Sequence, residues 1–112
     1  MTENTNNSSL IFIYITCPDS ITSEKIADYL INKDLIACAN IFPEITSICK
    51  WKNKKQTDKE SVLILKTSKN NFTSIESEVR KLHPYTCPCI ISIPTNSVNS
   101  DYMGWINNQL LK

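Results

Sequence analysis

Hydrophobic and polar residues follow the two periods of regular secondary structure along this chain. β-Branched and aromatic residues fill positions 10–16, which predicts a first strand that ends before Pro18. Asp19 or Ser20 then stands where the N-cap of a helix is expected. Apolar residues within 26–31 fall on one helical face, so the pattern predicts a helix directly behind the first strand.

The middle of the chain has the pattern of a long hairpin. An extended stretch after the first helix is expected to break at Pro43, because proline cannot donate to a strand ladder. Alternation over 45–51 predicts a strand, the polar residues 52–58 predict a hairpin connection, and 60–67 predicts the next strand. Within it, 62–65 is apolar on both faces, which is typical of a central strand or of a contact between subunits.

The last third predicts a helix, a strand and a final helix. Asn70 or Asn71 is expected to cap the first of these helices, which ends at His83-Pro84 because proline cannot continue it. A strand over 89–93 and a helix from Ser100 complete the order β-α-β-β-α-β-α. We therefore predict an α+β fold: a ferredoxin-like β-α-β-β-α-β core with an antiparallel sheet, followed by a C-terminal helix.

Length and charge restrict the function. The 112 residues suffice for one domain, which we place at 9–112 behind a flexible tail at 1–8. Twelve basic and eleven acidic residues give a net charge of +1, so we expect no nucleic-acid and no membrane partner. The four lysines within 50–55 indicate a solvated hairpin tip more than a phosphate-binding patch.

The N-terminal residues indicate a cytoplasmic location. They lack the positive flank of a secretory signal, and the apolar run at 10–15 is too short for a signal core or a membrane span. Thiols stay reduced in the cytosol, so the five cysteines are predicted to be free.

The proline-flanked segment 83–89 is the first candidate for chemistry. It holds His83, Cys87 and Cys89, and imidazole and thiolate are the ligands that copper and zinc prefer. The alternative is a stiff structural turn whose cysteines fill space as small apolar groups. His83 is the single histidine and no nucleophile motif accompanies it, so we predict no enzyme; a thiol enzyme using Cys87 or Cys89 with His83 is a distant alternative.

A second candidate combines Trp51 with Lys66 and Thr67 on paired strands. Trp51 suits core or interface packing. Lys66 is placed either to neutralise an anion or to pair with Glu60. With Tyr85 of the turn, Trp51 and Lys66 are the predicted ligand-binding or interface residues.

An ordered set of short motifs resembles one known family. The run Leu35-Ile36-Ala37-Cys38-Ala39-Asn40-Ile41 is similar to the L-x-A-C-x-N-I stretch of the CutA divalent-cation tolerance family. The remaining matches, in order, are Ile45-Thr46-Ser47-Ile48, Trp51, Lys66-Thr67, His83-Pro84-Tyr85, Pro88, Asp101-Tyr102 and Trp105-Ile106.

The resemblance implies a ferredoxin-like subunit in a cytoplasmic homotrimer, similar in assembly to PII signalling proteins. It also implies binding of a divalent metal, copper in particular, in metal tolerance, and it implies no catalytic activity. The alternative function is a structural or signalling trimer that binds a small ligand or a protein partner at its subunit interfaces.

The resemblance is incomplete at the metal site. The copper site described in bacterial relatives joins a cysteine late in the first strand to two adjacent histidines, and the matching positions here are Ile15, Leu82 and His83. Cys89 replaces a common acidic residue, which shifts the available ligands from hard to soft. We therefore hypothesise that copper is held as Cu(I) by His83, Cys87 and Cys89; the alternative is drift that left both cysteines inert.

Overall fold

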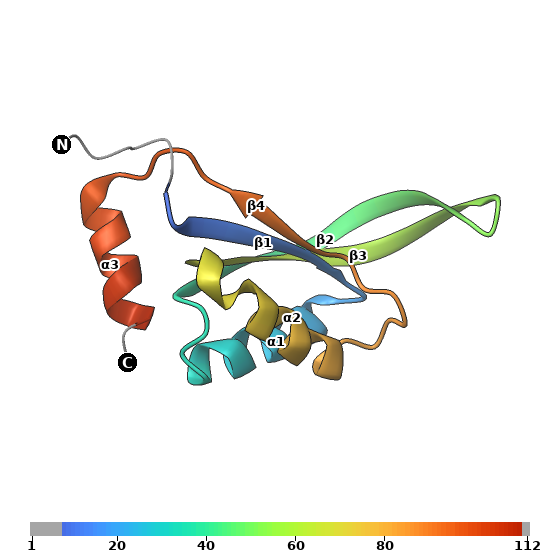
Figure 1. Cartoon of the computed structure of the whole chain (residues 1–112). Coiled ribbons are helices and arrows are strands. Elements are labelled where there is room, and N and C mark those ends of the chain that lie inside the picture. Colours follow the sequence, from blue (N-terminus) through green and yellow to red (C-terminus); the bar gives the residue numbers. More distant parts are fainter. Residues whose placement is uncertain (1–7, 111–112) are drawn as a thin grey trace.

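The computed structural model describes residues 8–110 and confirms the predicted fold class and element order (Figure 1). All but the last residue of the predicted tail, 1–8, lies outside the described residues. The elements are β1 (Leu10–Cys17), α1 (Ser20–Asn32), β2 (Cys38–Trp51), β3 (Lys54–Ser68), a short 3-10 helix η1 (Lys69–Asn71), α2 (Phe72–Leu82), β4 (Ile90–Pro94) and α3 (Ser100–Leu110).

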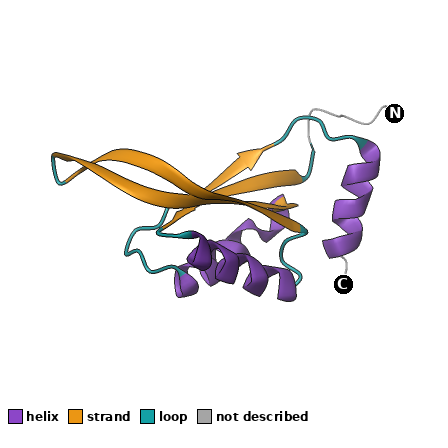
Figure 2. Ribbon diagram, turned by 180° about the vertical axis from the view of Figure 1, so that it is seen from behind, coloured by secondary structure: helices purple, strands orange, loops and turns teal. Residues whose placement is uncertain are grey.

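The four strands form one antiparallel sheet in the order β2-β3-β1-β4. Helices α1 and α2 cover one face of it, whereas α3 stands at one end of the sheet (Figures 1 and 2). β3 lies between β1 and β2, so the central position predicted for its two-sided apolar run is confirmed.

The main core lies between the sheet and the helices α1 and α2. Alternate residues of β1 point into it, and Ile13, Ile15 and Cys17 are fully buried there. The helices and β3 contribute the other fully buried members, which are Ile26, Leu30, Leu63, Leu65, Ile75 and Val79. α3 adds a smaller cluster by packing Ile106 beside Leu10 and Ala37.

The outer halves of β2 and β3 form an arm, residues 45–60, that projects from the sheet (Figures 1 and 2). The last β1–β3 pair joins Cys17 to Ser61, so Glu60 and the rest of the arm pair only with β2. The radius of gyration is 15.4 Å, larger than the value of about 13 Å expected for a compact domain of this length. The arm therefore accounts for the elongated shape.

The arm corrects two predictions. The segment 52–58 was expected to be a loop, but β3 already begins at Lys54 and the turn is Lys52-Asn53, both with positive φ (52° and 65°). Pro43 interrupts the ladder as expected, in an irregular register between Phe42 and Ile45, but it does not divide the strand, because β2 continues past it. Residues 54–59 are polar and exposed, so no burial period in the sequence marks them as part of a strand.

The predicted helix caps are confirmed in one case and wrong in the other. Asp19 Oδ1 accepts from the Thr22 N–H at 2.8 Å and caps α1. Asn71 precedes α2 without capping it, because its side-chain amide donates instead to Leu35 O and Thr67 Oγ1, at 3.2 Å each. Ser68 provides the cap one turn earlier, at η1.

Truncating a core residue of the sheet should show how much the core contributes to the free energy of unfolding. We expect Leu65→Ala to lower the free energy of unfolding by about 2–5 kcal/mol, because it leaves a cavity at a fully buried position. Ile21→Ala, on the outer face of α1 and 65% exposed, should change it by less than about 1 kcal/mol. Urea unfolding at one fixed protein concentration measures both, and equal losses would contradict this core.

Candidate functional site

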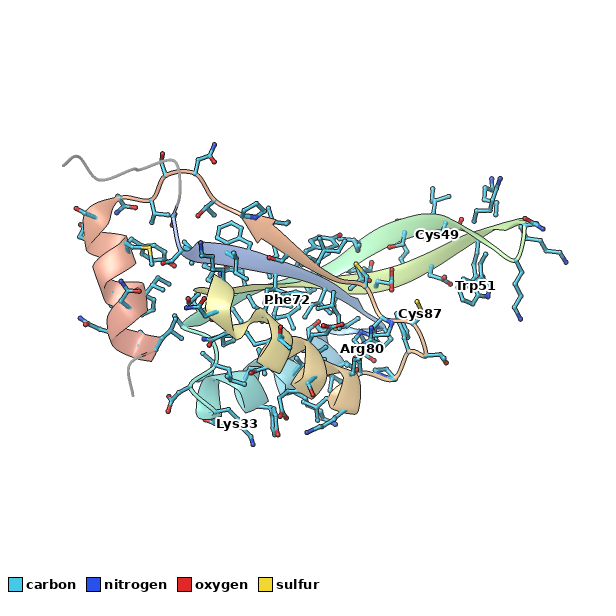
Figure 3. The ribbon with its side chains drawn as sticks, viewed as in Figure 1. Lys33, Cys49, Trp51, Phe72, Arg80 and Cys87 are labelled. Atoms are coloured by element: carbon cyan, nitrogen blue, oxygen red, sulfur yellow. The ribbon has the colours of Figure 1, made fainter. Side chains whose placement is uncertain are left out.

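The structure separates the residues of the predicted second cluster. Trp51 pairs with Lys54 at the tip of the arm, whereas Lys66 pairs with Cys38 and Phe12 inside the sheet. Figure 3 shows Trp51 and Cys49 out on the arm. Trp51 and Lys66 therefore do not meet within one chain, although both lie on β-strands of the same hairpin.

Lys66 lies among aromatic rings rather than beside the predicted carboxylate. Its Nζ is 5.9 Å from the centroid of Phe12 and 5.6 Å from that of Tyr102, which are distances for cation–π contacts. Glu60, the expected ion-pair partner, instead accepts a 2.7 Å hydrogen bond from the phenol of Tyr85. The Lys66–Glu60 pair is thus not formed.

His83 is buried, and both of its ring nitrogens are engaged. Nε2 lies 2.8 Å from the carbonyl oxygen of Thr16, and Nδ1 lies 3.1 Å from the backbone nitrogen of Tyr85. A carbonyl only accepts and a backbone N–H only donates, so Nε2 carries the proton and Nδ1 accepts. In this arrangement neither nitrogen offers a free lone pair to a metal or to a substrate proton.

Tyr85 continues the contacts of His83 toward the arm. Its ring centroid lies 4.7 Å from that of His83, and its hydroxyl donates to Glu60. Burial, followed by the hydrogen bond and the charge of Glu60, raises the pKa of the Tyr85 phenol. Tyr85 therefore stays protonated and acts as a hydrogen-bond donor.

The two cysteines of the turn differ in exposure. Cys87 is exposed in the loop between α2 and β4 (Figure 3), whereas Cys89 is half-buried. Burial raises the pKa of the Cys89 thiol, and hydrogen bonds from Thr16 offset part of that rise. The chain bends at Cys87 and β4 begins only at Ile90, so strand alternation does not place both sulfurs on one side.

The described residues do not assemble the predicted three-ligand metal site. No group of three or more His, Cys, Asp or Glu side chains within residues 8–110 is arranged to hold an ion. At the positions of the other family ligands, Ile15 is fully buried in the core and Leu82 is 41% exposed. His83, Cys87 and Cys89 thus do not fit a preformed site.

The face of the sheet opposite α1 and α2 carries apolar residues. The two-sided apolar run 62–65 predicted this for β3, but not for β1 and β4. One row crosses this face through Ile64, Tyr14 and Ile91, and the next brings Phe12 beside Ile93. α3 packs near Phe12 at one end of this open face. Ile91 and Ile93 remain 51% and 43% exposed, so residues 8–110 leave much of the open face uncovered.

In β1, the available signal for the open face was the lack of alternation between apolar and polar residues. Every residue from Leu10 to Ile15 is apolar or aromatic, although a strand with one solvated face alternates with polar residues. The Tyr85–Glu60 bond had no such signal, because the two residues are 25 positions apart in the sequence.

Within residues 8–110, no helix is long and apolar enough to cross a membrane.

Comparisons with known proteins give the family. A model of the CutA1 divalent ion tolerance protein matches residues 11–109. The divalent-cation tolerance protein CutA of Archaeoglobus fulgidus is 41% identical over 86% of this chain and 93% of its own length. A CutA homolog of Xenopus laevis is 36% identical over 91% of this chain and 68% of its own length.

A solved structure agrees with the sequence matches. The structure described as the periplasmic divalent cation tolerance protein CutA from Archaeoglobus fulgidus superposes with a TM-score of 0.87 at 38% identity, covering 90% of this chain and 98% of that one. Sheet order, helix placement and sequence thus point the same way, and the chain belongs to the CutA1 divalent ion tolerance protein family.

Proposed function

We propose that this protein acts in divalent-cation tolerance as a cytoplasmic, non-enzymatic homotrimer that binds metal, copper in particular. Its membership of a family named for divalent ion tolerance supports the first part. The relative from Archaeoglobus fulgidus is described as periplasmic, so the cytoplasmic location that we propose rests on this chain's five cysteines, which are all free thiols. The observation that supports the proposed homotrimer is the exposed apolar open face of the sheet.

A second copy of the chain is the occupant that the open face favours. Exposed apolar residues continue from Ile91 and Ile93 of β4 to Phe42 of β2, which is 53% exposed. Two exposed tryptophans add apolar surface elsewhere on the chain: Trp51 on the arm is 59% exposed, and Trp105 on α3 is 44% exposed. A patch of this extent is unusual on a monomer and is typical of an interface.

Association of copies in a closed ring would also cover the exposed edge strands of the sheet. β2 and β4 are the edge strands, and the 14 residues of β2 present a long row of free backbone groups. Packing of copies around a closed symmetry axis buries apolar faces and strand edges without leaving an open end. A trimer is therefore the assembly that we propose, as the family resemblance implies.

Charges placed on the open face should prevent association. We expect the wild-type protein to be a trimer by light scattering at micromolar concentration. The double variant Ile91→Lys with Ile93→Lys should be a folded monomer, because both side chains are already exposed in one chain and new charges oppose burial. Ile21→Lys, on the outer face of α1, is the control and should remain a trimer. A monomeric wild type would refute the assembly.

For the metal, we propose the sulfur atoms of Cys87 and Cys89 as ligands. Cys87 is exposed and Cys89 is half-buried, and thiolates favour Cu(I) over harder ions. His83, the third predicted ligand, can join them only by giving up its hydrogen bond to Thr16 or from Tyr85. The metal proposal therefore rests on two thiols in a loop rather than on a preformed cage.

Competition with a chromophoric Cu(I) chelator under anaerobic conditions tests this ligand set. Cys87→Ser with Cys89→Ser should weaken Cu(I) binding at least about tenfold, because serine oxygen is a hard ligand. Cys38→Ser with Cys49→Ser removes two thiols elsewhere and should compete like the wild type. Equal competition by the two double variants would show that the turn is no metal site.

One observation favours the alternative, a signalling trimer that binds an anionic ligand between subunits. The ion pairs of the described residues join Arg80 to Glu76 and Lys81 to Glu78, so the Lys66 ammonium has no carboxylate partner there. It lies beside the open face, among aromatic rings that would exclude water in an assembly. An anion shared between subunits would satisfy that charge.

A further inference from the structure

We infer that His83 and Tyr85 are positioning residues that fasten the arm to the body of the protein. The inference rests on the proposed homotrimer for its functional consequence, but not for its physical content. We call the connected set Thr16, His83, Tyr85 and Glu60 the clamp. Its bonds run from the Thr16 carbonyl through the His83 ring to the Tyr85 backbone, and from the Tyr85 hydroxyl to the Glu60 carboxylate.

The two ends of the clamp lie on either side of the point where the arm leaves the sheet. Thr16 is the last residue but one of β1, and it pairs with Val62 of β3. Glu60 is the first residue of β3 beyond its pairing with β1. The clamp therefore links the end of β1 to the base of the arm through His83 and Tyr85.

The middle of the clamp is held rigidly. The His83 backbone N–H donates to Val79 O at 2.8 Å, which fixes the residue to the end of α2. Its ring is 7% exposed and bonded at both nitrogens. Pro84 restricts the backbone between the two rings of the clamp. The clamp thus ties the arm to a helix terminus as well as to β1.

The arm needs such a fastening because the sheet supports it weakly. Its strands have no neighbour beyond each other in the described residues, and the register of β2 breaks between Phe42 and Ile45. A bulge at the base of a two-stranded ribbon lets the ribbon bend. Tyr85 reaches Glu60 at this same level, since Glu60 pairs with Ile45. The clamp therefore fixes the direction in which the arm projects.

A fixed arm matters for association. When an interface includes a mobile element, binding must order that element, and the lost conformational entropy weakens the association. A preorganised element avoids this cost. Phe42 lies at the base of the arm and Trp51 near its tip, and both belong to the apolar surface proposed to meet another copy. This role also accounts for a buried histidine whose nitrogens are both spent on hydrogen bonds.

Tyr85→Phe removes one bond of the clamp, and the chain contains a matched control. Tyr29 donates to Glu78 at 2.7 Å, the same distance and chemistry as the Tyr85–Glu60 bond, but on the helix layer. In a Trp105→Phe background, Trp51 is the single tryptophan and reports on the arm. Time-resolved anisotropy of Trp51 should gain a fast component in Tyr85→Phe and keep the background decay in Tyr29→Phe.

Histidine variants separate positioning from metal ligation. His83→Gln retains a side-chain donor and an acceptor and should largely preserve the slow anisotropy decay, whereas His83→Ala should lose it. We expect His83→Gln to compete for Cu(I) like the wild type. The inference would be overturned if His83→Ala kept the slow anisotropy decay. It would also be overturned if His83→Gln lost Cu(I) binding while its anisotropy decay stayed unchanged.

Subunit dissociation gives the functional readout. We expect Tyr85→Phe to weaken subunit association about tenfold relative to Tyr29→Phe, because an arm that is no longer fixed must be ordered when the subunits bind. A monomeric wild type would refute the proposed trimer and leave the anisotropy test of the clamp intact. A trimeric wild type with the same anisotropy in Tyr85→Phe and Tyr29→Phe would refute the clamp alone.

Discussion

The short central strand β1 determines the rest of this structure. It ends at Cys17 because the next residue is Pro18, which has no N–H to extend a ladder. Its neighbour β3 is 15 residues long and continues past that end with β2 as its remaining partner. One proline thus divides the hairpin into an inner half that belongs to the core and an outer half that projects as the arm.

How far the sequence predicts this fold depends on burial. α1 and α2 were predictable because one face of each is buried, so positions such as Ile26 and Val79 impose a period on the sequence. β1 was predictable from its run of apolar residues, most of them β-branched or aromatic. The polar start of β3, residues 54–58, was missed because these residues are exposed, and a polar strand then has the composition of a loop. Lys54 was accordingly assigned to a turn, although it begins β3.

The candidate site was less predictable because its chemistry depends on contacts between distant residues. The sequence places imidazole and thiols within one turn, but it cannot show that Thr16, 67 positions away, occupies one nitrogen of His83. The same holds for Tyr85, whose hydroxyl donates to Glu60, a residue that the sequence offered as a partner for Lys66. Residue types indicated which chemistry was available, and hydrogen bonds determined how much of it is already used.

Charge at the tip of the arm restricts where such a chain can associate. Lys50 lies directly opposite Lys55 in the ladder, with Lys52 and Lys54 beside the turn, and like charges so placed repel each other. Lysines on an exposed edge also discourage edge-to-edge pairing, which is the hazard of a long free strand. The tip is thus protected by charge, whereas the open face at Ile91 and Ile93 is not. In the proposed trimer, association through the apolar face and the base of the arm would close on itself, and the lysines would keep further copies from pairing with the strand edges at the tip.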